Sequence, residues 1–205
     1  MRFVIGITGS IACGKSFVSK TLNDMGYPVI DTDLISHNLT QDNAKVNDDL
    51  ASYFPEAVSN GILNRKKLGE IVFNDTKRRI KLNEILHPLI FKMTKEEIDK
   101  NDGIIFVDVP LMFEAHFDVL CDKIICVYTE KSSQLERLMK RDNISAVEAL
   151  KKIESQMPIE DKIKKSDFIL KSEEDFNDTK KNIVDILDKI KEEYYAKTTR
   201  NIWTC

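Results

Sequence analysis

The chain has 205 residues, 42% of them hydrophobic and 32% charged, a composition that suits one sizeable core and excludes a mainly disordered or collagen-like protein. Its 31 basic and 34 acidic residues give a net charge of −3, so no global basic field draws the chain to nucleic acid or to anionic lipid. No stretch of about 18 apolar residues is present to span a bilayer. Four scattered cysteines without metal or disulfide spacing favour a reducing, cytoplasmic location.

Short β-branched runs alternate with longer helical stretches along the chain. Five runs predict β-strands, of which the last is a shorter candidate: residues 3–7, 28–31, 104–109, 124–128 and 168–170. This alternation is typical of an α/β fold in which a parallel sheet is flanked by helices.

Three regions predict helices. A helix is expected over residues 15–25, and helical spacing without a convincing strand dominates from about residue 34 to residue 100. The C-terminal stretch is predicted to be an amphipathic helix that closes the domain. Its apolar face is formed by Phe176, Ile183, Ile186, Leu187, Ile190 and Tyr194.

The first predicted strand leads directly into the pattern G-x-x-x-x-G-K-[ST], and a predicted helix follows it. In such a phosphate loop, backbone amides turn inward around phosphate oxygens, Lys15 reaches the β- and γ-phosphates, and the Ser16 hydroxyl binds Mg²⁺. The pattern predicts binding of a nucleoside triphosphate and leaves open what happens to the γ-phosphate. The residues expected to contact ATP are Gly9, Ala12, Cys13, Gly14, Lys15, Ser16 and Phe17.

A small-molecule kinase is favoured among the classes of protein that carry such a loop. The chain lacks the N-K-x-D segment of switch GTPases and the L-S-G-G-Q segment of transporter ATPases. A kinase needs a base near the attacking hydroxyl and cations that close over the phosphates. Asp33 follows the second predicted strand, where a carboxylate can act as general base, bind magnesium through water, or simply cap a helix.

Arg137 and Arg141 supply the cations in this interpretation. They lie four residues apart, so on a helix they point the same way and can clamp a phosphoryl group, although a pair of surface cations has the same spacing. Residues 131–165 carry nine basic and six acidic residues, which gives this stretch a local positive charge.

Several separated segments together make the chain resemble the dephospho-CoA kinase family, whose members phosphorylate the 3′-hydroxyl of dephospho-coenzyme A in the last step of coenzyme A synthesis. The resemblance runs from about residue 3 to residue 195, and the segments downstream of the phosphate loop make it specific. The segments are residues 5–16, Ile30-Asp-Thr-Asp33, residues 63–73, Ile85-Leu-His-Pro88, Val109-Pro-Leu-Met-Phe-Glu114, residues 134–141, Gln156-Met-Pro158 and Ser166-Asp-Phe168.

The resemblance implies a P-loop NTPase fold in three parts. A nucleotide-binding core would comprise residues 1–34, 99–130 and 166–205, a helical acceptor-binding region residues 35–98, and a helical lid residues 131–165. ATP and dephospho-CoA are the expected partners, with Mg²⁺ as cofactor and without nucleic acid or membrane. Protein partners stay open.

The resemblance also assigns roles to single residues. Asp33 becomes the general base, Lys15 and Ser16 hold phosphate and magnesium, and Arg137 and Arg141 belong to the closing lid. The implied acceptor contacts are Thr8, Asp33, Arg65 and His87, where His87 alternatively is an ordinary histidine at a helix end. Asp108, at the end of a hydrophobic strand, is a candidate for a magnesium contact through water, although aspartate is common at strand ends.

Four positions depart from the family pattern. His37 stands where the family usually has Arg, which weakens one expected contact or makes it pH-dependent, and Lys171 stands where an Asn is common, which affects the contact to the nucleotide base. Ala12 and Cys13 replace the usual Gly and Ser of the loop, and Cys13 would make the loop sensitive to oxidation if the helix end stabilised its thiolate. The alternative functions are another nucleoside or nucleotide kinase and a non-catalytic nucleotide-gated binding protein.

Overall fold

The structure is a computed structural model that describes residues 1–42, 44–59 and 62–202. The chain divides into two compact units, one formed by Met1–Ile30 with Ile98–Cys205 and the other by Asp31–Glu97. Each unit is described by itself. Within the described residues, no helix is both long and apolar enough to cross a membrane.

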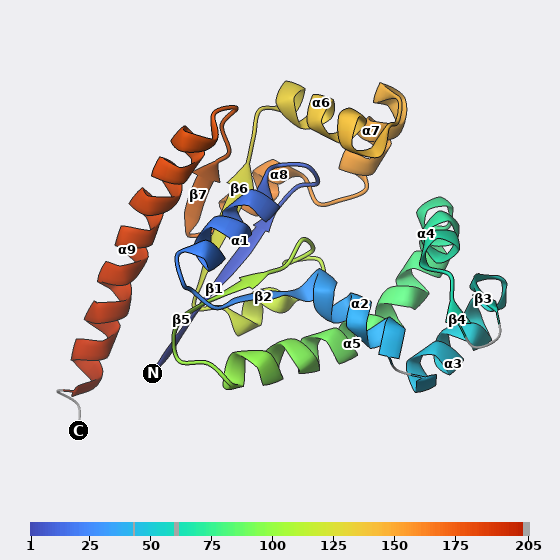
Figure 1. The fold of residues 1–205 in the computed structure, drawn as a ribbon, viewed down its shortest axis with the longest axis horizontal. Helices are drawn as coiled ribbons and strands as arrows, with labels where there is room; N and C mark the ends of the chain where they lie inside the picture. Colours follow the sequence, from blue (N-terminus) through green and yellow to red (C-terminus); the bar gives the residue numbers. More distant parts are fainter. Residues whose placement is uncertain (43, 60–61, 203–205) are drawn as a thin grey trace. The chain divides into compact units, whose positions relative to one another are not determined.

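A five-stranded sheet organises the first unit, in the order β2-β5-β1-β6-β7 (Figure 1). The central strand β1 pairs in parallel with β5 on one side and with β6 on the other, and β6 pairs in parallel with β7. The predicted α/β fold with a parallel sheet is therefore confirmed. The strands are β1 (Arg2–Gly9), β2 (Val29–Asp31), β5 (Gly103–Asp108), β6 (Lys123–Tyr128) and β7 (Phe168–Lys171).

Helices α1 (Lys15–Asp24) and α9 (Phe176–Ile202) pack on this sheet and build its core. Every residue of β1 after Arg2 is buried, as expected for a central parallel strand covered on both faces. The core joins aromatic and aliphatic side chains of the strands with those of the two helices: Phe3, Ile5, Ile7, Val18, Leu22, Phe106, Ile125, Val127, Leu170, Ile183, Ile186, Leu187 and Ile190.

One residue of the predicted apolar face of α9 lies outside the core. Phe176 is 64% exposed, and its ring packs at a centroid distance of 4.7 Å against Phe17 of α1. Phe176 is the first residue of α9. The pair links the start of α9 to the residue that follows Ser16.

The segment between β6 and β7 contains α6 (Lys131–Asp142), α7 (Ala146–Glu154) and α8 (Ile159–Lys164). α6 and α7 contact each other, and a capping box between Ser145 and Glu148 begins α7. α8, in contrast, contacts β1 and β6. The last helix of the segment predicted as a lid therefore packs directly on the sheet. A 3₁₀-helix, η2 (Phe117–Leu120), precedes β6.

The second unit is mainly helical, as predicted, with a small exception. β3 and β4 form a two-stranded antiparallel hairpin in a region that the sequence predicted to lack strands. Two-residue strands are too short to show an alternating pattern. The elements are α2 (Thr32–Asp42), α3 (Ala44–Tyr53), η1 (Pro55–Ala57), β3 (Val58–Ser59), β4 (Ile62–Leu63), α4 (Arg65–Asn74) and α5 (Thr76–Asp99), whose end belongs to the first unit.

Phe54 is one of the buried apolar residues of the second unit. Its side chain is fully buried, together with that of Leu50. The Arg78 guanidinium lies 5.0 Å from the centre of the Phe54 ring, donates to the Tyr53 carbonyl at 2.8 Å, and pairs with Glu56. Arg78 thus joins α5 to the end of α3 and to η1.

Candidate active site

The phosphate loop connects the end of β1 to the start of α1, as the sequence predicted. Gly14 caps α1 with a φ of 94°, in the left-handed region that favours glycine. A Cβ atom there would meet the Ser172 hydroxyl at 2.2 Å, and at Gly9 it would meet the Val127 carbonyl oxygen at 2.4 Å. Both glycines are therefore required by local geometry, independently of any ligand.

Ala12 also adopts a left-handed conformation, with a φ of 58°. Because backbone amides bind the phosphate in such a loop, the methyl group of Ala12 removes no phosphate ligand. The structure adds a cost, because a residue with a Cβ is strained in this region by about 1 kcal/mol. The strain is a backbone reason for which glycine would suit this position better than alanine.

Lys15 begins α1 and forms an ion pair with Asp108, the last residue of β5. The other carboxylate oxygen of Asp108 accepts a hydrogen bond of 2.6 Å from Ser19. Asp108 is buried, so its charge is compensated by this lysine and this hydroxyl. The structure thus brings together the lysine of the loop and the aspartate that the sequence singled out at the strand end, while Ser16 lies exposed in the first turn of α1.

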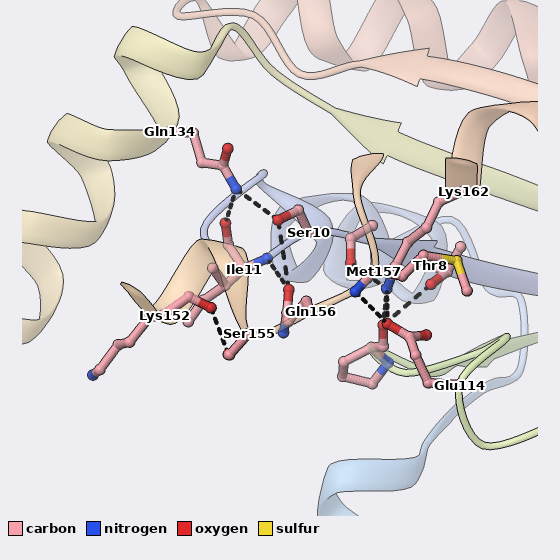
Figure 2. A network of polar contacts seen from close by, with 12 residues as sticks. Thr8, Ser10, Ile11, Glu114, Gln134, Lys152, Ser155, Gln156, Met157 and Lys162 are labelled. Carbon is pink, nitrogen blue, oxygen red and sulfur yellow. Dashed lines mark hydrogen bonds and ion pairs between the residues drawn. The ribbon is translucent and has the colours of Figure 1, made fainter. Parts of the chain in front are cut away.

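Two glutamines from outside the phosphate loop form hydrogen bonds with it (Figure 2). The sequence analysis did not identify either of them. Gln134 of α6 donates to the Ser10 hydroxyl at 2.7 Å and to the Ile11 carbonyl at 2.8 Å. Gln156, which follows α7, accepts the Ile11 amide at 2.8 Å. Both lie in segments that carried the family resemblance, but a lone glutamine carries no signal of its partner.

The two arginines predicted to form a clamp have different partners. Arg137 is half-buried and donates to the Ser172 hydroxyl at 3.2 Å and to the Glu173 carbonyl at 2.9 Å, next to Gly14. Arg141 is exposed and pairs with its neighbour Asp142. Hydrogen bonds from Arg141 and Lys152 lower the pKa of Asp142 to about 2. Equal spacing on a helix therefore did not give the two side chains a common partner.

Lys171 lines an open pocket of about 360 Å³ beside the loop. Its ammonium pairs with Glu130 at 3.4 Å and with Glu173 at 3.3 Å. Ser172, the next residue, lies beside the phosphate loop. Its hydroxyl accepts a hydrogen bond from Arg137 and lies where a Cβ atom on Gly14 would be. The pocket is lined by Thr129, Glu130, Ser133, Lys171, Ser172, Glu173, Glu174, Asp175 and Asp178.

Cys13 is buried, and its burial raises the pKa of its thiol above 9.0 although the Lys15 backbone and charge act in the opposite direction. The hypothesis of a stabilised thiolate that makes the loop sensitive to oxidation is therefore not supported. Burial outweighs the helix end at this position.

Thr8 is fully buried on β1, and its hydroxyl donates to the Pro110 carbonyl at 3.3 Å. Phe17 packs against the core of the first unit. The contacts of both side chains are therefore with the protein itself, and their predicted roles toward acceptor and ATP stay predictions.

Asp33 lies in the first turn of α2, two residues after the end of β2. The side chain that caps the start of α2 is that of Asp31 and not that of Asp33. It accepts hydrogen bonds from the Asp33 amide at 2.8 Å and from the Leu34 amide at 3.1 Å. The Asp33 side chain is exposed. Its position thus leaves the carboxylate accessible from solvent.

Arg65, the first residue of α4, is turned toward α2. Its guanidinium donates to the His37 carbonyl at 3.2 Å and to the Ser36 carbonyl at 3.4 Å, and it contacts the Thr40 hydroxyl. His37 itself is exposed on α2. Arg65 therefore connects the N-terminus of α4 to the helix that carries Asp33.

His87 lies inside α5, which continues through Pro88 to Asp99. The interpretation as a histidine at a helix end is therefore wrong: the helix tolerates the lost amide donor of Pro88 and does not end before it. His87 is partly buried, and this burial lowers the pKa of its imidazole below 6.5.

Burial of His87 predicts a pH dependence of stability. Because the unfolded chain binds the proton more readily, the free energy of unfolding should fall as the pH decreases from 6.5 through the lower pKa of the folded state. Urea unfolding of the wild type and of His87→Gln between about pH 5 and pH 7.5 measures this contribution. The variant should show the weaker pH dependence, and equal slopes in the two proteins would contradict the assignment.

Comparisons with known proteins agree with one another. The family model for dephospho-CoA kinase matches residues 3–178. A dephospho-CoA kinase from Listeria monocytogenes serotype 4b is 37% identical over 195 residues, which cover 92% of this chain and 98% of the relative. The crystal structure of TT1252 from Thermus thermophilus has a TM-score of 0.79 and 31% identity, covering 92% of this chain and 97% of that one. A dephospho-CoA kinase from Campylobacter jejuni has a TM-score of 0.70 and 33% identity, covering 94% and 99%.

Proposed function

The chain belongs to the dephospho-CoA kinase family, and from this premise we propose that it transfers the γ-phosphoryl group of ATP to the 3′-hydroxyl of dephospho-coenzyme A. The observation that carries the proposal is the match of the family over most of the chain, together with a complete phosphate loop whose Lys15 begins a helix. The family match supports dephospho-coenzyme A as the acceptor, and the phosphate loop supports ATP as the phosphoryl donor.

The proposed reaction is an in-line displacement. The hydroxyl oxygen bonds to the γ-phosphorus, the bond from that phosphorus to the bridging oxygen of the β-phosphate breaks, and ADP leaves. Asp33 accepts the proton of the hydroxyl as general base. Its exposure in the first turn of α2 and the separate capping role of Asp31 support this assignment.

Charge neutralisation at the phosphates falls to Lys15 and to the helix that it begins. Lys15 is the first residue of α1, so it lies at the helix end that carries a partial positive charge. Lys15 is held beside this end by Asp108. We assign the remaining cations, Arg137 and Arg141, to the phosphates as well, with Arg137 the better supported because it lies next to Gly14.

The donor set near the loop fits Mg²⁺. Within residues 1–42, 44–59 and 62–202, no group of three or more His, Cys, Asp or Glu side chains forms a metal cage. Mg²⁺ does not need one, because it is commonly held by one or two protein oxygens, substrate phosphates and water. Ser16 would supply a protein oxygen and Asp108 a contact through water, and the bound ion would offset charge on the phosphates.

Thr8, Arg65 and His87 are proposed on the acceptor side. Support is strongest for Arg65, because its contacts with α2 hold the helix that begins beside Asp33. A cytoplasmic location completes the proposal. It is supported by Cys13, Cys121 and Cys126, which are free thiols, as expected in a reducing compartment.

An assay of ADP release with a panel of acceptors tests this function. Dephospho-coenzyme A should be phosphorylated, and adenosine, uridine and AMP should give background rates. Turnover with a nucleoside or with AMP in its place would favour the alternative of another nucleotide kinase. Tight ATP binding without turnover of any acceptor would favour a nucleotide-gated binding protein.

A further inference from the structure

A lysine with a fully buried side chain lies beside the phosphate loop, outside the residues to which the proposed function gives a role. Lys162 belongs to α8 and is 0% exposed. Its ammonium donates to the Pro110 carbonyl at 2.8 Å and to the Gly9 carbonyl at 3.4 Å, and it lies 3.1 Å from a carboxylate oxygen of Glu114 (Figure 2). The three donors of the ammonium thus meet three acceptors.

Stability alone does not explain this arrangement. Taking an ammonium out of water is costly, and a buried ion pair often contributes no more to stability than well-packed apolar side chains of similar size. Unlike an apolar residue, Lys162 donates hydrogen bonds to two backbone carbonyls and so fixes their direction.

Both carbonyls lie at places that matter for phosphate binding. Gly9 is the first residue of the phosphate loop, so a donor on its carbonyl fixes the peptide plane from which the loop amides turn inward. Pro110 lies two residues after Asp108, the partner of Lys15. Lys162 therefore contacts both the phosphate loop, which contains Lys15, and the segment after β5, which follows the partner of Lys15.

Glu114 extends the network to the other side of the loop. The carboxylate oxygen that pairs with Lys162 also accepts the Met157 amide at 3.1 Å. Met157 directly follows Gln156, whose side chain accepts the Ile11 amide. The loop is thus held at Gly9 and at Ile11 by groups that Lys162 and Glu114 connect.

We propose that Lys162 is a positioning residue for phosphoryl transfer, which acts through the Gly9 and Pro110 carbonyls and through Glu114 without touching a substrate. The inference rests on the proposed function for its activity readout. Loss of the ammonium frees the Gly9 carbonyl, and displacement of reacting groups by about 1 Å can lower a rate by about 10²-fold.

A double-variant cycle separates positioning from stability. Lys162→Met should lower both the urea midpoint and kcat, because it leaves Glu114 without its buried partner. Lys162→Met/Glu114→Gln removes both charges and should recover most of the midpoint. Its kcat should stay about 10²-fold below that of the wild type, because the Gly9 carbonyl still lacks the ammonium and the Pro110 carbonyl keeps only the longer hydrogen bond from the Thr8 hydroxyl. Lys164→Met is the matched control, since Lys164 is an exposed lysine of the same helix paired with Asp161.

The KM values and a binding measurement complete the test. The KM for dephospho-coenzyme A should be unchanged, and the Kd of ADP, measured without acceptor, should rise about tenfold in the double variant because the loop amides are misplaced. A double variant with the kcat and ADP affinity of the wild type would overturn the proposal. Failure of the wild type to phosphorylate dephospho-coenzyme A would instead contradict the proposed function, while the ADP measurement would still decide the role of Lys162.

Discussion

Replacement of Asp33 by Asn should lower kcat by about 10²–10⁴-fold, the usual contribution of a general base. The Kd of ATP should stay unchanged, because the phosphate loop lies elsewhere in the sequence and keeps all its contacts. The free energy of unfolding should also stay unchanged, because Asp33 is exposed and Asp31 caps the amides at the start of α2.

Steady-state kinetics with dephospho-coenzyme A, together with calorimetric ATP titration, measure these effects. Asp48→Asn is the matched control, because Asp48 is an exposed carboxylate on α3 of the same unit. An Asp33→Asn enzyme with the kcat of the wild type would remove Asp33 from the mechanism. A loss of kcat that is accompanied by an equal loss in the control would show a general effect of surface charge.

Replacement of Lys15 by Met should lower kcat by about 10²–10³-fold and weaken ATP binding, because a cation aimed at the transferring group is lost. The same change should lower the free energy of unfolding. Asp108 is buried, and without Lys15 it loses the cation that compensates its charge.

The double variant Lys15→Met/Asp108→Asn separates the two effects. It should regain much of the stability while its kcat stays low. Lys20→Met is the control within α1, since Lys20 is exposed and pairs with Asp24. Recovery of kcat in parallel with stability would show that Lys15 acts as a structural partner of Asp108 and not on the phosphates.

The sequence predicted well what depends on local pattern. The run from Phe3 to Ile7 is apolar throughout, which marks a central parallel strand, and the spacing of Gly14, Lys15 and Ser16 marks the turn into α1. The hairpin of β3 and β4 was missed because two-residue strands show no periodicity.

Contacts between distant side chains could not be predicted in the same way. Arg137 and Arg141 share a helix and a spacing, but the Ser172 hydroxyl lies within reach of Arg137 while Asp142 holds Arg141. Lys162 was one of nine basic residues in a segment interpreted as a charged lid. Two of its three acceptors are backbone carbonyls, and these are present at every residue and carry no signal in the sequence.

Analysis of the product formed from γ-labelled ATP and dephospho-coenzyme A tests the central claim most directly. The account predicts one labelled phosphate per acceptor, attached to the ribose 3′-oxygen and released by a 3′-nucleotidase. No transfer from an acceptor that lacks the 3′-hydroxyl is expected. Label on any other oxygen, or release of free phosphate without labelled product, would contradict it.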